Sequence, residues 1–499
     1  MVSFLHLILI SSPFLVLFLF KKYTSINNLS ARPPGPRGLP IIGNLHQLDS
    51  SKLSLQLWKL SNIYGPLFSL QIGLKPAIVV SSPKLAKQVL KDHDLTVCSR
   101  PPSLGQQKLS YNGLEMIFSP YNDYWREIRK ICVVHFFSSK KISSYSHVRN
   151  FEVNQMIKKI LGHVDSSKIT NLSEIIMSVS SAIICRIAFG RRYEDEGAER
   201  SRFHGLLNES QAMFLTFFIR DYVPFMGWVD ILTGSLTRLE NIFKELDVFF
   251  QEVIDEHLDP NREKGTEEGD IVDVLLELKK QGRLSIDLTN NHIKAIIMDI
   301  LVAATDTSAA TSVWVMTGLM KNPRVMKKAQ EEIRNTYGKK TFINEDDIQN
   351  LVYLKAVIKE TLRFFAPAPL VPRETNKSMV INGYEIQPKT LVYVNVWAIQ
   401  RDPEAWKEPE EFYPERFINN DIDFKGQDFE LIPFGSGRRM CPGIPLGIAT
   451  VELIIANLLN SFDWEMPAGM TRDDIDTEGL PGLAQHKKNH LCLVAKHHT

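Results

Sequence analysis

Two long apolar runs of this 499-residue chain have the spacing of helices. Residues 289–321 form the first run, and Asn322-Pro323 ends it because proline cannot continue a helix. Residues 444–459 form the second, with apolar side chains recurring every three to four positions. The first is predicted to be a long, largely buried helix, and the second is predicted to be a helix.

Short segments elsewhere predict a small β region. Residues 67–72 and 77–80 flank a turn, and residues 379–386 contain Asn382-Gly383, a pair that favours a type I′ hairpin turn. Residues 259–270 contain no large apolar side chain and are predicted to form a solvated loop. The fold class expected from these patterns is mainly α with a small β region.

The N-terminus is a separate apolar module. Residues 2–20 carry no formal charge, and about twenty such residues span a bilayer. A cleaved signal peptide is the alternative, but no basic segment and no small-residue cleavage site precede Lys21-Lys22. These lysines should stay in the cytosol. We therefore expect a single-pass anchor at 1–20, a basic, proline-rich hinge at 21–40 and one cytosolic domain at 41–499.

Composition narrows the class of protein further. A net charge of +1 and a pI near 7.7 give no reason to expect nucleic acid as a partner. The cysteines are odd in number, scattered and without a CxxC pair, which is typical of a reduced, cytosol-facing chain. They are Cys98, Cys132, Cys185, Cys441 and Cys492.

The candidate chemistry is concentrated in the run Phe434-Gly-Ser-Gly-Arg-Arg-Met-Cys-Pro-Gly443. Its glycines let the backbone approach a flat ligand, and Arg439 supplies a charge that would lower the pKa of the Cys441 thiol or pair a carboxylate. The predicted helix at 444–459 begins next, and its dipole would favour a thiolate. A structural cysteine beside a glycine turn is the alternative.

This run resembles the haem-binding loop of the cytochrome P450 family at all five signature positions, Phe434, Gly437, Arg439, Cys441 and Gly443. The resemblance implies haem b (iron protoporphyrin IX) as cofactor, with Cys441 as the metal ligand and the other four positions as cofactor-binding residues. It also implies the cytochrome P450 fold, in which a long central helix covers the haem and the cysteine loop lies on the proximal side.

Asp306 and Thr307 interrupt the longest apolar helix. A buried acid is costly unless it is paired, hydrated or used. In the resembling family an acid-threonine pair relays protons to bound dioxygen, so the resemblance assigns this catalytic role to Asp306 and Thr307. Ala304 stands where the family more often has glycine. The alternative is a threonine bonded to its own helix, with the aspartate at the surface.

Two further motifs gain meaning from the resemblance. Glu360 and Arg363 lie three residues apart and could be an ordinary surface pair, but the family joins such residues to a later arginine, here Arg416, in a buried structural network. Trp125 and Arg129 share a helical face. The resemblance places both at the haem propionates, together with Arg373 and Arg439.

The resemblance implies a monooxygenase at the endoplasmic reticulum membrane that uses O2 and electrons from NADPH-cytochrome P450 reductase, with cytochrome b5 as a second candidate partner. Mostly apolar segments at 103–118, 213–219, 366–371 and 480–483 are expected to line a site for a small aromatic plant metabolite, of the aldoxime or flavonoid/isoflavonoid class. The alternatives are a reductase-independent haem-thiolate isomerase or dehydratase and a non-catalytic haem-binding membrane protein.

Overall fold

The structure is a computed structural model that describes residues 32–193, 198–262, 269–338 and 340–498. The predicted anchor at 1–20 and the first half of the predicted hinge lie outside the described residues.

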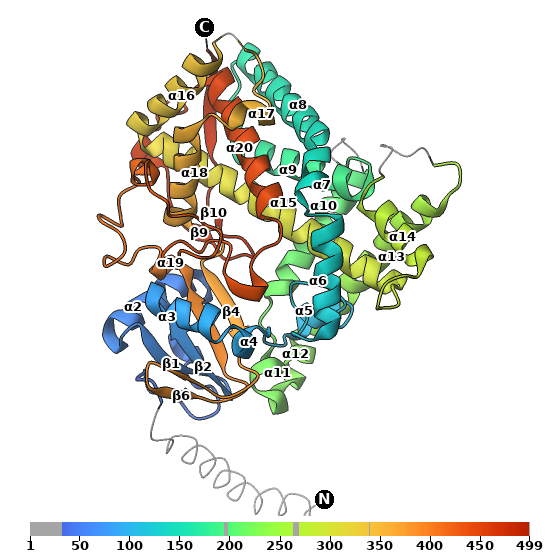
Figure 1. Ribbon diagram of the computed structural model, residues 1–499, viewed down its shortest axis with the longest axis vertical. Coiled ribbons are helices and arrows are strands. Elements are labelled where there is room, and N and C mark those ends of the chain that lie inside the picture. The colour runs from blue at the N-terminus through green and yellow to red at the C-terminus, as the bar shows by residue number, and fades with distance from the viewer. Residues whose placement is uncertain (1–31, 194–197, 263–268, 339, 499) are drawn as a thin grey trace, which may run out of the picture.

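Helices dominate the described chain (Figure 1). The α-helices are α2 (Leu53–Tyr64), α3 (Pro83–Lys87), α4 (Asp94–Val97), α5 (Leu104–Leu109), α6 (Asp123–His135), α7 (Ser139–Ser144), α8 (Ser146–Asp165), α9 (Leu172–Phe189), α10 (Ala198–Leu215), α11 (Ile219–Tyr222), α12 (Trp228–Leu232), α13 (Ser235–Leu258), α14 (Ile271–Gln281), α15 (Asn290–Lys321), α16 (Pro323–Tyr337), α17 (Glu345–Ile348), α18 (Val352–Phe365), α19 (Val396–Ile399) and α20 (Ile444–Ser461). Tighter or wider helical turns are η1 (Leu45–Gln47), η2 (Ser50–Lys52), η3 (Gln88–Asp92), η4 (Pro224–Met226), η5 (Pro414–Phe417), η6 (Gly437–Arg439) and η7 (Arg472–Asp474).

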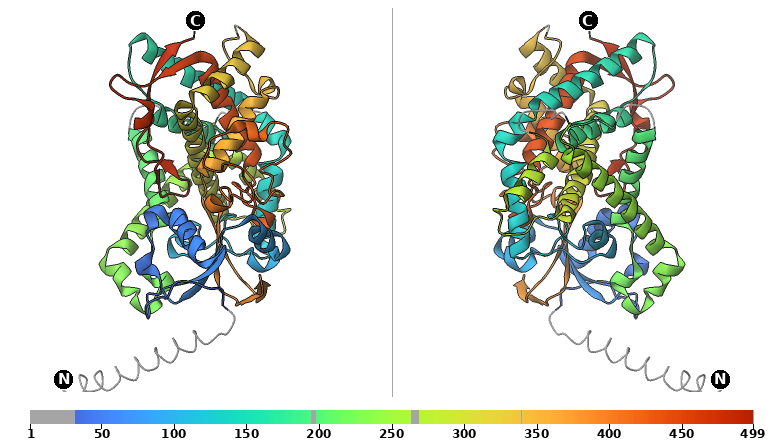
Figure 2. Two further views of the ribbon diagram at one scale, coloured as in Figure 1. Left: turned by 90° about the vertical axis from the view of Figure 1, so that its left-hand side faces the viewer. Right: turned by 90° about the vertical axis from the view of Figure 1, so that its right-hand side faces the viewer.

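The strands form small sheets at the edges of the helical body. They are β1 (Leu67–Ile72), β2 (Lys75–Val80), β3 (Thr170–Asn171), β4 (Leu370–Glu374), β5 (Met379–Ile381), β6 (Tyr384–Ile386), β7 (Leu391–Asn395), β8 (Phe462–Glu465), β9 (Gly479–Leu480), β10 (His486–Lys487) and β11 (Cys492–His497). The largest sheet has the order β1-β2-β7-β4, in which only the β2–β7 pair is parallel. It lies at the end of the molecule opposite the C-terminus (Figures 1 and 2). The prediction of a mainly α fold with a small β region is confirmed.

Helix α15 is the central element and packs against α9, α18 and α20. It begins after the Thr289 cap, whose hydroxyl pairs with His292, and ends at Asn322 before Pro323. Three described helices, α9, α15 and α20, are long and apolar enough to cross a membrane by composition, but 67–83% of their apolar windows are buried inside the protein. Their hydrophobicity is therefore explained by the core.

The local predictions were accurate at the helix ends and hairpins. Asn382 and Gly383 both have positive φ, as a type I′ turn requires. The segment 103–118, one of those expected to line the substrate site, contains helix α5. The described residues of the segment 259–270 form no helix or strand, as predicted, and residues 259–261 are exposed. Asp270 at its end is buried, because Arg262 forms an ion pair with it.

Candidate active site

Cys441 is presented by a tight loop just before α20. Its backbone N–H donates to Phe434 O over 3.0 Å, which closes the loop on itself. Gly437 has a φ of +72°, and a Cβ there would lie 2.5 Å from Leu90 O, so only glycine fits. Gly443 caps α20, and a Cβ on it would lie 3.8 Å from Cys441 Sγ. The sulfur therefore lies beside the positive end of the helix dipole.

The charge near the sulfur comes from a different arginine than expected. Burial raises the pKa of Cys441, while the backbone N–H of Gly443 and the Arg129 guanidinium oppose that rise. Arg439 instead donates to the carbonyl oxygens of Cys98, Met116 and Ser119. Of the two tasks expected of Arg439, lowering the pKa of the thiol falls to Arg129 instead, and pairing a carboxylate stays a prediction. Because burial dominates, a metal ion would be needed to hold the thiolate.

Three arginines from distant segments converge near this loop. Burial, and the neighbouring charges of Arg100 and Arg439, hold the pKa of Arg373 well below its usual range. Burial lowers the pKa of Arg100 to about 10 and that of Arg439 to about 9. Throughout the described ranges, none of the three forms an ion pair with a carboxylate. Buried cations without a counter-charge are costly, so an anionic ligand is expected to bind at this cluster.

Arg100 was missed by the sequence analysis. It lies just before Pro101-Pro102 in an unremarkable stretch, and its role depends on contacts with Ile117 O and Pro372 O, 17 and 272 residues away. No local pattern distinguishes it from a surface arginine.

Trp125 and Arg129 both lie on α6 at the edge of this cluster. The Trp125 indole donates to Met116 O over 2.8 Å, and Arg129 donates to Met440 O over 2.6 Å. The Arg439 guanidinium lies 4.2 Å from the centre of the Trp125 ring. Trp125 thus orients Arg439 and does not itself present a free donor.

Asp306 and Thr307 point to different sides of α15, as adjacent helical residues must. The Thr307 hydroxyl donates to Ala303 O over 2.6 Å, and the residue is exposed in the middle of an otherwise buried helix. Asp306 is buried and pairs with His486 Nε2 over 2.5 Å. A Cβ on Gly447 of α20 would lie 3.8 Å from Ser308 Oγ, so the helix after Cys441 packs next to this stretch of α15.

Glu360 lies between two arginines in a buried network. Arg363 donates to both of its carboxylate oxygens over 2.7 and 2.8 Å, and Arg416 Nε lies 3.2 Å away. Tyr413 N donates to the same carboxylate over 2.8 Å. The network therefore ties α18 to η5.

The segments expected to line a substrate site come together only in part. Phe118 and Phe214 stack with ring centres 5.1 Å apart, which joins the end of α10 to the loop after α5. Leu480 and Leu483 instead line a groove whose wall also includes Asp306.

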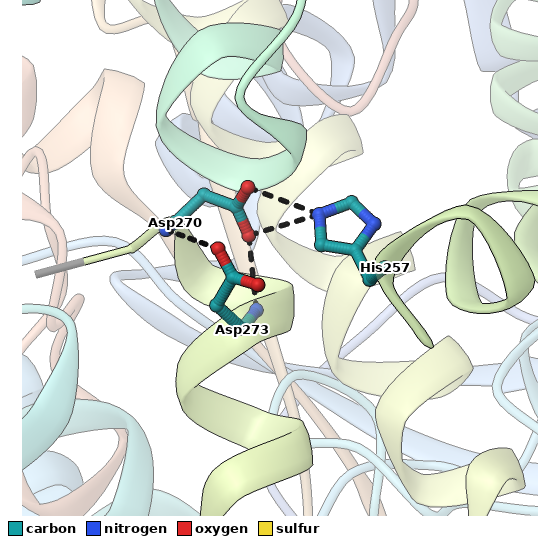
Figure 3. A group of neighbouring side chains, drawn as sticks. All are labelled: His257, Asp270 and Asp273. Carbon is teal, nitrogen blue, oxygen red and sulfur yellow. Dashed lines mark hydrogen bonds and ion pairs between the residues drawn. The ribbon is translucent and has the colours of Figure 1, made fainter. Parts of the chain in front are cut away.

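One group of side chains in the described residues has the spacing of metal ligands, His257, Asp270 and Asp273 (Figure 3). His257 Nε2 lies 3.0 Å from Asp270, and the two aspartates cap α14 reciprocally. Arg262 forms ion pairs with Asp270 over 2.6 Å and Asp273 over 2.9 Å. A guanidinium thus supplies the positive charge, and the group closes the α13–α14 connection.

Comparisons with known proteins agree with this geometry. The family model for cytochrome P450 matches residues 33–494. The chain is 49% identical to 6,7,8-trihydroxycoumarin synthase of Pastinaca sativa over 99% of this chain and 98% of that protein. It is also 49% identical to 5-OH-xanthotoxin synthase of Pastinaca sativa, over 96% of each, and 48% identical to cytochrome P450 71B10 of Arabidopsis thaliana, over 93% of each.

A solved structure of a zebra fish cytochrome P450 with progesterone has the same fold, with a TM-score of 0.76 at 23% identity over 89% of this chain and 99% of that one. The chain therefore belongs to the cytochrome P450 family. It has the cytochrome P450 fold, its cofactor is haem b, and it is a monooxygenase.

The described residues fit a haem. Cys441 Sγ is available at the start of α20, and the arginine cluster lacks a described anionic partner, which the two haem carboxylates would supply. The glycines of the cysteine loop keep its backbone close enough to pack on a flat ring.

Proposed function

We propose that this protein is a membrane-anchored haem-thiolate monooxygenase that oxidises a small, planar aromatic plant metabolite, with electrons delivered from NADPH by NADPH-cytochrome P450 reductase. The observation that carries the proposal is the arrangement of Cys441 at the start of α20, beside the arginine cluster and next to the stretch of α15 that holds Thr307.

Each of these residues has a separable task. Cys441 holds the iron as a thiolate, and Arg100, Arg373 and Arg439 neutralise the carboxylates of the cofactor. Haem supplies the activation of O2, for which no side chain is suited. The Thr307 hydroxyl lies on the exposed face of α15, where it orients protons. Asp306 is the adjacent acid, and its side chain lies on another side of the helix.

Two observations support an aromatic substrate. Phe118 is half-buried and stacks on the buried Phe214, so it offers a flat apolar face. The names of two relatives refer to a coumarin and to xanthotoxin. We therefore place coumarins and furanocoumarins first, and keep aromatic aldoximes and flavonoids or isoflavonoids as further candidates.

We place the protein on the cytosolic face of the endoplasmic reticulum membrane. The uncharged residues 2–20 have the length of one membrane span. Large apolar side chains are also exposed around α11 and α12, a patch suited to a lipid surface. They are Phe217, Phe225, Trp228, Ile231 and Leu232. Cytochrome b5 is a second candidate electron donor beside the reductase.

The first experiment is the reduced, carbon-monoxide-bound absorption spectrum of the wild type and of Cys441→Ser in microsomes. A strongly red-shifted Soret band in the wild type that is absent in the variant is expected for thiolate ligation. Product formation from a panel of these aromatic classes should then require both reductase and NADPH. Turnover of a hydroperoxide without reductase would instead identify an isomerase or dehydratase.

A further inference from the structure

The acid of α15 faces away from Thr307 and toward a histidine. Asp306 Oδ1 and His486 Nε2 are 2.5 Å apart, and the aspartate side chain is only 5% exposed. The His486 side chain is 30% exposed. The pair thus runs from the interior of the helical core toward solvent.

A groove of about 600 Å³ leads to this pair from outside. Its walls are α9, α10, α15 and the β9–β10 hairpin, which lies beside α15 (Figure 1). Asp306 and His486 both line it. The other charged or titratable groups of its lining are Glu174, Arg200, His204, Lys487, Lys488 and His490.

The position of His486 is fixed by its neighbours. Trp314 on α15 donates to Gln485 O over 2.7 Å, and Gln485 N donates to Pro367 O over 2.8 Å. The adjacent lysines are engaged elsewhere, since Lys487 pairs with Asp476 and Lys488 with Glu478. Of the described basic side chains, His486 is the one that contacts Asp306.

We propose that His486 is the proton donor to Asp306, and that this groove is the route by which protons reach the oxygen-activating site from solvent. The inference rests on the proposed monooxygenase function. The imidazole takes a proton from water in the groove and passes its Nε2 proton to Asp306 Oδ1. Asp306 then passes this proton through water to the Thr307 side of α15, because no hydrogen bond joins the two side chains directly. The ring exchanges with water until Nε2–H is restored. One proton enters for each one that leaves, and no electron moves.

A histidine suits this task because it gains and loses a proton near neutral pH, unlike a lysine or an arginine. Solvent at one end and a buried carboxylate at the other give the proton a path. The Thr307 hydroxyl does not supply the proton itself, because it donates to Ala303 O in its own helix.

The test uses the holoenzyme with reductase and three variants. His486→Gln keeps a hydrogen-bond donor to Asp306 but cannot pass on a proton. His486→Lys keeps a charged N–H group that can donate a proton to Asp306. His490→Gln removes another imidazole from the same groove, one that contacts Asn171 and not Asp306. Equal red-shifted carbon-monoxide bands must first show that all variants hold haem alike.

We expect His486→Gln to slow turnover roughly tenfold. This loss is smaller than the ~100-fold typical of a group that itself protonates the reacting atom. The solvent isotope effect on turnover should become larger. His486→Lys should recover most of the rate and retain it to higher pH, because an amine keeps its proton where an imidazole has lost it. His490→Gln should match the wild type. Wild-type turnover in His486→Gln, or equal defects in the Gln and Lys variants, would overturn the route.

A second readout does not depend on activity. In the reduced, carbon-monoxide-bound holoenzyme, the short Asp306–His486 hydrogen bond should give a proton NMR resonance far downfield of the amides. Asp306→Asn and His486→Gln should each remove it, and His490→Gln should not. Its absence from the wild type would refute the contact. Failure of the proposed function would look different, since the red-shifted band itself would be missing.

Discussion

Arg363 donates two hydrogen bonds, of 2.7 and 2.8 Å, to the carboxylate of Glu360, and both side chains are fully buried. Arg416 and the backbone of Tyr413 complete the ring of donors around that carboxylate. The pair lies three residues apart on α18, but its burial comes from the segment around η5 that folds over it.

Glu360→Gln should prevent accumulation of the folded protein. The change leaves Arg363 buried without its counter-charge, at a cost of about 3–5 kcal/mol. The amount of protein with a red-shifted carbon-monoxide band measures the loss. Glu331→Gln is the control, because Glu331 forms an exposed pair with Lys327 on α16 and should cost less than about 0.5 kcal/mol. Equal yields of the two variants would show that the network is not required.

Arg373→Gln should weaken haem binding roughly tenfold or more, the effect of one lost charge-assisted hydrogen bond. The same change should stabilise the haem-free protein, because it removes one of three mutually repelling buried cations. Haem transfer to an apomyoglobin acceptor and thermal unfolding measure these effects. Arg438→Gln removes a neighbouring charge that pairs with Asp94 at the surface, and should leave haem binding unchanged. Weaker binding in both variants would point to a general charge effect.

Thr307→Val should divert reducing equivalents to hydrogen peroxide. Valine preserves the shape of the side chain but removes the hydroxyl that orients protons, so product per NADPH should fall about tenfold or more. Peroxide, product and NADPH are measured together. Thr317→Val removes a similar hydroxyl, which bonds back to Val313 O elsewhere on α15, and should not alter the coupling. Unchanged coupling in Thr307→Val would exclude its proposed task.

The stability of the protein should depend on Glu452 in α20. Burial raises the pKa of Glu452 to about 7, with Lys355 opposing the shift and Glu345 adding to it. An unfolded glutamate has a pKa of about 4.3. Between these values the folded state holds a proton that the unfolded state has released, so stability falls as pH rises.

Glu452→Gln should therefore match the wild type near pH 4 and exceed its stability by about 3–4 kcal/mol at pH 8. Unfolding midpoints of the solubilised holoenzyme across this range measure the effect. Glu465→Gln is the control, because Glu465 is exposed and pairs with Lys496. Parallel pH curves for wild type and Glu452→Gln would contradict the prediction.

The fold class and the centre of the site could be predicted from local pattern. Helix α15 begins at the Thr289 capping box and ends before Pro323, helix α20 begins with a proline in its first turn, and the cysteine loop has glycines where its backbone needs them. Such features depend on neighbours a few positions away, which a sequence displays directly.

The partners of the site residues were decided by the tertiary structure. Arg100 reaches Pro372, His486 reaches Asp306 across 180 residues, and Arg129 takes the place beside the sulfur that Arg439 was expected to fill. These contacts depend on how distant segments pack around α15. Charge, burial and hydrogen bonding act through space, so the chain alone determined which residues carry the chemistry, and the fold determined which of them act on each other.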